Sequence, residues 1–212
     1  ACVSPLWDTA IAGNALCDSG LPADHPALIK AAEWILSKQV VKKGDWIVKN
    51  PYAAPGGWAF EFFNELYPDC DDTAEILMFL NRIKLPDQNQ KLKESERAMS
   101  WLLSMQCKGG GWAAFDVNNE MNLLNQVPFA DHGAMLDPPT VDVSGRVLWL
   151  LARTGFKKNH PQVNKAINFI KDNQESDGSW WGRWGVNYIY GSWLALTGLY
   201  FIGEDMSQPY VK

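Results

Sequence analysis

A repeat of about 67 residues is the feature that most constrains how this chain can fold. Glutamine follows an amphipathic segment at Gln39, Gln106 and Gln174, so the steps between them are 67 and 68 residues. Each segment places apolar residues at i, i+3, i+4 and i+7, the spacing of an amphipathic helix. In repeats of this length each unit buries its apolar face against its neighbours. The sequence therefore predicts an array of stacked helices.

A glycine turn and a tryptophan are expected to end each repeat. The predicted endings are Gly44-Asp45-Trp46, Gly110-Gly111-Trp112 and Gly178-Ser179-Trp180. A glutamine amide can cap the end of a neighbouring helix while the indole stacks over it. We expect these endings to tie consecutive units together.

Apolar helices alternate with the amphipathic ones. The seven predicted helices cover residues 4–16, 28–39, 71–83, 95–106, 140–152, 163–174 and 191–202. Such alternation is typical of a ring in which one set of helices faces solvent and the other lines the middle. No strand pattern is longer than a few residues. The prediction is an all-α fold, an incomplete α/α toroid, with residues 1–212 forming a single partial domain.

Composition excludes several classes of function. The net charge is −5 with no basic cluster, which argues against nucleic acid as a partner. The four cysteines show no C-x-x-C spacing, and His25, His132 and His160 are isolated, so we expect no metal and no cofactor. No apolar run approaches the roughly 18–20 residues of a membrane-spanning helix.

Three carboxylates crowd the predicted start of one apolar helix. Asp69, Asp71 and Asp72 fall within four residues, directly after Pro68. The proline disfavours a helical residue before it, and Asp69 or Asp71 is a good N-cap. Capping needs one carboxylate or two, and three repel one another, so one should keep its proton and could serve in acid catalysis. A purely structural cluster is the alternative.

Aromatic residues are expected around this acid cluster. If the apolar helices run in the same direction, their N-termini converge on one mouth of the ring. Eleven tryptophans are more than a core of this size requires. The residues predicted at the mouth are Trp7, Asp8, Phe60, Phe115, Asp142, Arg146, Trp184 and Tyr190, with the rigid turn Asp137-Pro138-Pro139 leading into the helix at 140–152.

Four motifs together resemble one known family. They are D-C-D-D-T-A at 69–74, the repeated glutamine–glycine–tryptophan ending, D-P-P-T-x-D-V at 137–143, and G-S-W-W-G-R-W-G-V-N-Y-x-Y-G at 178–191. With them the chain resembles the bacterial squalene–hopene cyclases, which are class II triterpene cyclases. The match runs from end to end and covers about the middle third of such an enzyme. It implies two α-toroidal domains, of which this chain is most of the acid-bearing one.

The resemblance also implies a reaction and roles for particular residues. The family protonates a terminal double bond of squalene and closes rings through carbocations, ending at hopene or hopanol. The resemblance makes Asp71 the proton donor, flanked by Asp69 and Asp72, with Arg146 hydrogen-bonded to the surroundings of the acid. The implied substrate-binding or cation-binding residues are Trp7, Asp8, Phe60, Phe115, Trp184 and Tyr190, and the supporting ones are Asp137 and Asp142.

Two residues depart from the family pattern. The best-known members carry histidine where Arg146 stands, and often tyrosine where Phe115 stands. Arginine cannot relay a proton, so a chain of waters would have to return a proton to Asp71. The resemblance further implies a homodimer on the cytoplasmic face of the inner membrane, with squalene as the substrate.

Other readings of the same residues stay open. A related class II cyclase could make tetrahymanol, or could act on oxidosqualene or on a diphosphate. A prenyltransferase β-subunit shares the ring but needs a zinc set that the sequence does not offer. A toroidal scaffold whose tryptophans only join helices is the non-enzyme alternative.

Overall fold

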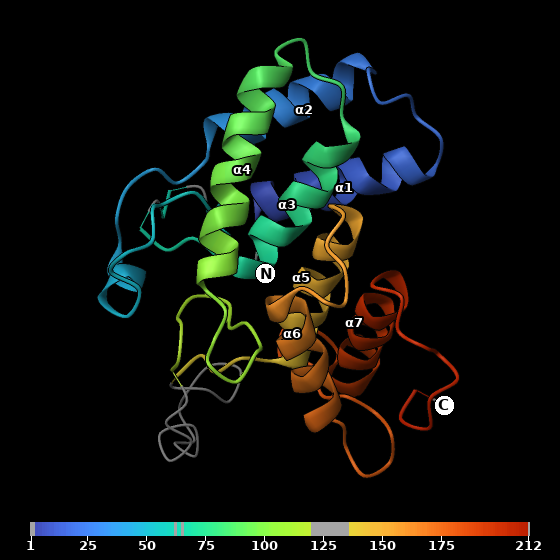
Figure 1. Cartoon of the computed structure of the whole chain (residues 1–212). Helices are drawn as coiled ribbons and strands as arrows, with labels where there is room; N and C mark the ends of the chain where they lie inside the picture. Colours follow the sequence, from blue (N-terminus) through green and yellow to red (C-terminus); the bar gives the residue numbers. More distant parts are fainter. Residues whose placement is uncertain (1–2, 62, 65, 120–135, 212) are drawn as a thin grey trace. The chain divides into compact units, whose positions relative to one another are not determined.

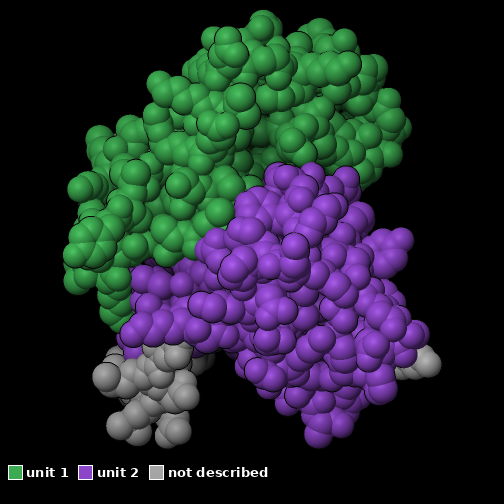
Figure 2. Space-filling model, viewed as in Figure 1, with its two compact units in different colours: residues 1–104 green, residues 105–212 purple. Residues whose placement is uncertain are grey.

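The computed structural model describes residues 3–61, 63–64, 66–119 and 136–211. Within them the chain is helical, with seven α-helices and one short 3₁₀ helix, and its only extended pairing is two isolated bridges. The chain divides into two compact units, Ala1–Ser104 and Met105–Lys212 (Figure 2). All seven predicted helices are present. That residues 1–212 form a single partial domain stays a prediction.

The first unit is organised around α3 (Cys70–Arg82). This helix packs against α1 (Pro5–Asp18) and α4 (Gln88–Ser104), while α2 (Pro26–Ser37) contacts both α1 and α3 (Figure 1). Every residue of α3 from 70 to 80 is buried, whereas α4 buries one face only. The predicted alternation of an inner apolar helix with an outer amphipathic helix is thus confirmed for this pair. The 3₁₀ helix η1 (Asp45–Val48) lies in the connection from α2 to α3.

Helices α1 and α3 run in the same direction. Asn14 Nδ2 donates to Glu75 Oε1 at 2.8 Å, and further along both helices Arg82 Nη2 lies 2.6 Å from Asp18 Oδ1. Contacts that advance together along two helices require a parallel arrangement. The N-termini of α1 and α3 therefore lie at the same end of the unit, so the condition under which the N-termini of apolar helices converge holds for this pair.

The second unit is organised around α5 (Val141–Arg153). This helix packs against α6 (Pro161–Asp172) and most extensively against α7 (Asn187–Phe201). A Cβ on Gly145 would lie 2.5 Å from the carbonyl oxygen of Leu194, so glycine is required for the backbones of α5 and α7 to come this close.

Two helices begin earlier than predicted. Helix α4 begins at Gln88, seven residues before the predicted 95, and α7 begins at Asn187, four residues before the predicted 191. The seven added residues of α4 are largely exposed and polar, and the four added residues of α7 are exposed except for the half-buried Tyr190, so neither set gave a periodic apolar pattern. A helix turn that buries little gives no periodic signal in the sequence.

Each repeat glutamine connects two parts of its unit. Its amide Nε2 donates to the carbonyl of a glycine in the following loop and to a main-chain carbonyl of a later segment. These acceptors are Gly56 and Glu94 for Gln39, Gly110 and Gln162 for Gln106, and Gly178 and Tyr210 for Gln174, all at 2.7 or 2.8 Å.

The first repeat ending was assigned wrongly from the sequence. Gln39 reaches Gly56, 17 residues further along the chain, whereas the other two glutamines reach a glycine four residues away. Gly56-Gly57-Trp58 is therefore the ending of the first repeat, and the intervening residues are an insertion that contains Gly44-Asp45-Trp46. Trp46 packs instead against Trp101, with ring centroids 6.1 Å apart and planes at 85°.

The indole, and not the glutamine amide as expected, satisfies a helix end. Trp58 Nε1 donates to the carbonyl of Ile35 in the last turn of α2, and Trp180 Nε1 donates to that of Ile170 in the last turn of α6, both at 2.8 Å. Carbonyls in the last turn lack their regular partner within the helix. The indole therefore satisfies the helix end, while the glutamine amide makes the longer connection.

Candidate functional site

The three aspartates form a buried cluster at the start of α3. Asp69 is the N-cap, and its Oδ1 accepts the backbone N–H groups of Asp71 at 2.7 Å and of Asp72 at 3.2 Å. The exposed fractions of Asp69, Asp71 and Asp72 are 6, 7 and 2%. The predicted helix start is confirmed, and the cap is Asp69, one of the two candidates.

Two hydrogen bonds donated by main-chain N–H groups join this cluster to the loop before it. The N–H of Asp69 donates to the carbonyl of Trp58 at 2.7 Å, and the N–H of Trp58 donates to the hydroxyl of Thr73 at 2.9 Å. Trp58 and Thr73 are fully buried. The first turn of α3 is therefore joined to the end of the first repeat by two bonds.

The bond from a tryptophan N–H to a side-chain hydroxyl recurs twice in the second unit. The N–H of Trp112 donates to the hydroxyl of Ser144 at 2.9 Å, and the N–H of Trp180 donates to that of Ser192 at 3.0 Å. Sequence reasoning missed these hydroxyl residues together with Thr73. Their signal was available, because each is a small hydroxyl residue near the start of an otherwise apolar helix.

Two of the predicted aromatic residues are attached to the start of α1. Ser4 caps α1 by accepting the N–H of Trp7 at 3.0 Å, and its hydroxyl donates to the carbonyl of Phe60 at 2.5 Å. Trp7 and Phe60 are half-buried. Because α1 and α3 are parallel, both residues belong to the end of the unit that carries the aspartates.

Asp8 has a different environment from the other predicted site residues of the first unit. It is exposed and lines a groove of about 300 Å³ between α1 and α2, together with Thr9 and Leu16. Its role in binding stays a prediction.

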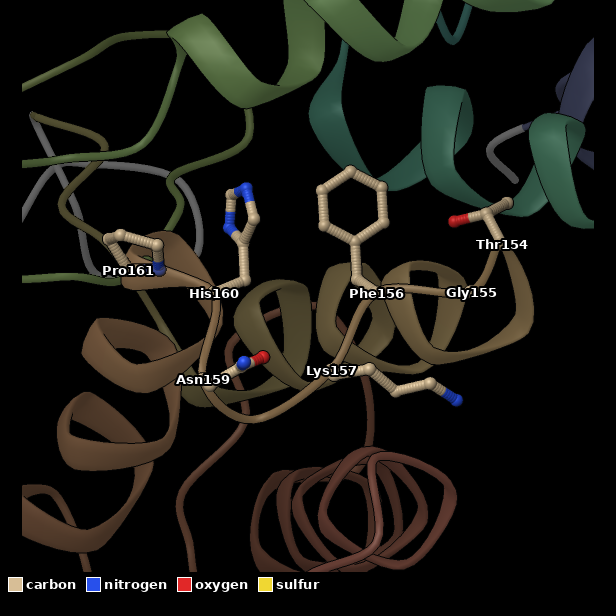
Figure 3. Close-up of a pocket in the computed structure, with 7 residues that line it drawn as sticks. All are labelled: Thr154, Gly155, Phe156, Lys157, Asn159, His160 and Pro161. Carbon is tan, nitrogen blue, oxygen red and sulfur yellow. The ribbon is translucent and has the colours of Figure 1, made fainter.

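A larger pocket, of about 490 Å³, lies at the connection from α5 to α6 (Figure 3). Phe156 and His160 line it, with their rings edge to face and centroids 4.9 Å apart. It contains none of the predicted site residues, so it gives no support to the acid chemistry.

Arg146 and Tyr190 meet in the second unit. Arg146 is 2% exposed, and its Nη2 donates to the hydroxyl of Tyr190 at 2.8 Å. Its guanidinium carbon lies 5.9 Å from the ring centroid of Trp193, a residue of the predicted apolar helix 191–202 that is not among the predicted site residues. Asp71 belongs to the first unit, and the expected hydrogen bond between Arg146 and the surroundings of that acid stays a prediction.

A pair of aromatic rings lies beside two carboxylates. Phe115 and Trp184 pack edge to face, with ring centroids 6.0 Å apart and planes at 85°. Asp137 Oδ2 accepts the N–H of Phe115 at 2.6 Å, and Asp142 Oδ2 accepts the N–H of Trp184 at 2.8 Å. The supporting residues predicted from the sequence are thus placed next to two of the predicted aromatic residues.

Burial is the largest influence on the pKa values of Asp137 and the neighbouring Arg183. It raises the pKa of Asp137 to about 6, although the N–H of Phe115 and the charge of Arg183 act in the opposite direction. Burial lowers the pKa of Arg183, which the charges of Asp137 and Asp142 oppose. Arg183 was missed as a site residue, since a single arginine among tryptophans gives no distinctive pattern.

The described residues contain neither a metal-ion cluster nor a membrane-spanning helix. No group of three or more His, Cys, Asp or Glu side chains there could hold a metal ion. No helix in that part of the chain is both long and apolar enough to cross a membrane. His132, one of the three isolated histidines, lies outside the described residues.

Comparison with known proteins identifies the family. The family described as "Squalene-hopene cyclase C-terminal domain" matches residues 3–212. The chain is 47% identical to a squalene–hopene cyclase of Schizosaccharomyces japonicus over 204 residues, and 48% identical to one of Zymomonas mobilis over 201 residues. It is also 47% identical over 206 residues to a dammaradiene synthase of Dryopteris crassirhizoma. These alignments include 92–93% of this chain but only 30–31% of each relative, so the chain spans about a third of their length.

Solved structures show the same fold. The type II terpene cyclase MstE from Scytonema superposes with a TM-score of 0.60 at 20% identity, over 97% of this chain and 52% of that one. A variant of that enzyme in complex with geranylgeranyl dihydroxybenzoate gives a TM-score of 0.62 at 19% identity, over 97% and 51% of the two chains. The likeness confirms the predicted all-α fold of the α/α toroid type. With the family match over nearly its whole length, the chain belongs to the squalene–hopene cyclase C-terminal domain family.

Proposed function

We propose that the complete protein carrying this chain cyclises squalene to a pentacyclic triterpene, hopene or hopanol, and that Asp71 starts the reaction by protonating a terminal alkene. The observation that carries this proposal is the buried cluster at the start of α3, in which Asp69 serves as the cap. The squalene–hopene cyclases among the relatives support squalene as the substrate.

The geometry supports different roles for the three carboxylates. Asp69 Oδ1 accepts two N–H groups, a role for which that oxygen needs no proton. The donor is then Asp71 or Asp72, and the family pattern selects Asp71. The helix N-terminus stabilises the aspartate that remains after proton transfer, which strengthens the acid. Negative charge on Asp69 and Asp72 opposes loss of the proton before substrate arrives.

The carbocations that follow need stabilisation without water. Aromatic faces supply it, at about 0.5–2 kcal/mol for each ring. Five of the predicted aromatic residues are half-buried, so that part of each side chain is packed and part is accessible. They are Trp7 and Phe60 in the first unit and Phe115, Trp184 and Tyr190 in the second. We propose these rings as the groups that stabilise the carbocations. No metal or cofactor enters this proposal.

Replacing the proposed donor tests the function directly. Asp71→Asn in the complete protein should abolish squalene turnover and leave the circular dichroism of the helices unchanged, because the amide cannot donate the proton. Asp24→Asn is the matched control, since Asp24 is exposed in the turn before α2, and it should keep full turnover. Products are identified by mass spectrometry. Turnover by Asp71→Asn would refute the assignment.

A second product class has support from the relatives. The dammaradiene synthase of Dryopteris crassirhizoma is as similar to this chain as the squalene–hopene cyclases are, and a sporulenol synthase of Bacillus subtilis is 41% identical. The proposed acid step would be the same for such a product, and only the end of the cascade would differ. Incubation with squalene and separately with oxidosqualene, followed by product identification, decides between hopene or hopanol and these alternatives.

We also propose that the complete protein works at a membrane surface, on the cytoplasmic face of the inner membrane, and as a homodimer. The support for the membrane surface is the chemistry of squalene, a hydrocarbon that partitions into the bilayer. Co-sedimentation of the complete protein with vesicles, and its mass by light scattering, test the two parts. A protein that stays in the supernatant, or a monomer, contradicts the corresponding part.

A further inference from the structure

Two carboxylates accept hydrogen bonds from the main-chain N–H groups of two aromatic residues. Asp137 accepts the N–H of Phe115, and Asp142 accepts the N–H of Trp184, while the two rings meet edge to face. Asp142 lies in the first turn of α5, and Asp137 lies in the turn that leads into it. The relative position of the rings therefore depends on both carboxylates.

The two carboxylates are satisfied to different degrees. Asp142 is fully buried, and each of its oxygens accepts an N–H, from Val143 at 3.0 Å and from Trp184 at 2.8 Å. Asp137 uses Oδ2 for Phe115, while its Oδ1 is buried without a hydrogen-bond partner. The neighbouring Arg183 likewise has a buried Nε without a partner. Of the two carboxylates, Asp137 is therefore the one whose negative charge is stabilised by fewer hydrogen bonds.

Burial, more than the neighbouring charges, sets the pH at which Asp137 ionises. The carboxylate of Asp116 disfavours its negative charge and Arg183 favours it, while burial raises its pKa to about 6. Arg183 also interacts with Asp142. An ionised carboxylate accepts a hydrogen bond roughly twice as strong as a neutral group does. The bond to the N–H of Phe115 is therefore stronger above about pH 6 than below it.

We propose that Asp137 is a positioning residue whose negative charge holds the main chain of Phe115, so that the Phe115 ring keeps its edge-to-face contact with Trp184, and that losing this charge alters the product mixture. The part concerning products rests on the proposed function. Asp137 acts only through Phe115 and not by touching substrate.

Nuclear magnetic resonance tests, without any substrate, whether the charge of Asp137 holds the main chain of Phe115. The complete protein is labelled with ¹⁵N-phenylalanine, and the Phe115 amide signal is assigned by its loss in Phe115→Leu. We expect this signal to titrate with a midpoint at about pH 6 and to lose that titration in Asp137→Asn. Asp116→Asn is the matched control and should keep the titration with a lower midpoint, because a like charge is removed. A titration that persists in Asp137→Asn, or one absent from the wild type, overturns the inference.

Product analysis tests the consequence. The wild type should change its ratio of main to side products by about twofold to tenfold between pH 5 and pH 7.5, the range that one hydrogen bond can account for. The ratio made by Asp137→Asn should not depend on pH. A merely structural role would lower total turnover and leave this pH dependence in place, which would overturn the proposal.

The two proposals fail in distinguishable ways. If the wild type forms no cyclic product from squalene, the proposed function is wrong, and the Phe115 titration alone then decides whether Asp137 holds that residue. If the wild type cyclises squalene with a pH-independent product ratio and Phe115 shows no titration, the inference about Asp137 is wrong and the proposed function stands.

Discussion

The hydroxyl of Tyr190 accepts a hydrogen bond from Nη2 of Arg146 at 2.8 Å, and this bond joins the first turn of α7 to α5. Arg146 is 2% exposed, and a guanidinium buried to this degree needs acceptors for its N–H groups. Arginine donates hydrogen bonds and accepts none. The Tyr190 hydroxyl is therefore one of the acceptors that the buried guanidinium of Arg146 needs.

Removal of the Tyr190 hydroxyl should destabilise the protein. We expect Tyr190→Phe to lower the free energy of unfolding by about 1.5–3 kcal/mol, because the bond is made to a charged group. Urea unfolding of the complete protein measures this. Tyr188→Phe, on the same turn but 49% exposed, should change it by less than about 0.5 kcal/mol. Equal losses in the two variants would contradict a specific bond.

The capping role of Asp69 can be separated from its charge. Asp69→Ala removes the acceptor for the N–H groups of Asp71 and Asp72 and should cost about 0.5–2 kcal/mol of stability. Asp69→Asn keeps a side-chain oxygen that caps comparably well, so its urea midpoint should stay close to that of the wild type. If both variants lose the same stability, capping is not what Asp69 contributes.

The hydroxyl of Thr73 should be essential to the first repeat ending. Thr73→Val keeps the shape of the side chain but leaves the buried N–H of Trp58 without this acceptor, at a cost of about 1–3 kcal/mol. Thr73→Ser keeps the hydroxyl and should lose less. Unfolding midpoints of the two variants provide the comparison, and a valine variant as stable as the serine variant would argue against the bond.

Asp137 should make stability depend on pH. Its pKa is raised in the folded state from 3.8 to about 6, so the folded protein binds the proton more tightly and stability falls as pH rises from about 4 to 6. Asp137→Asn lacks this loss, and relative to wild type it should gain at most about 3 kcal/mol between pH 4 and pH 7. Urea unfolding at several pH values checks this, and a constant difference would show that Asp137 does not titrate there.

Close contact between α5 and α7 predicts a strong effect at one glycine. A Cβ at Gly145 would lie 2.5 Å from the carbonyl oxygen of Leu194, so Gly145→Ala should force the helices apart and cost about 1–3 kcal/mol or more. Gly109→Ala is the matched control, because nothing lies within 4 Å of its Cβ. Thermal unfolding of both variants measures the difference, and equal midpoints would contradict the close approach.

The amino-acid sequence by itself determined the helices, the start of α3 and the family. These depend on neighbours in the chain: periodic apolar residues predict a helix, and the proline before Asp69 marks its beginning. Where a turn buries little, as at the start of α4, the local signal is absent and the boundary was misplaced.

Tertiary structure alone decided which residues meet across long stretches of chain. Gln39 pairs with Gly56 because an insertion separates the glutamine from its glycine turn, and spacing along the sequence pointed instead to Gly44. Asp137 and Asp142 reach backbone N–H groups 22 and 42 residues away. Backbone N–H groups are present in every residue except proline, so no sequence pattern identifies the one that a given carboxylate will accept. Only the packing of the helices makes that choice.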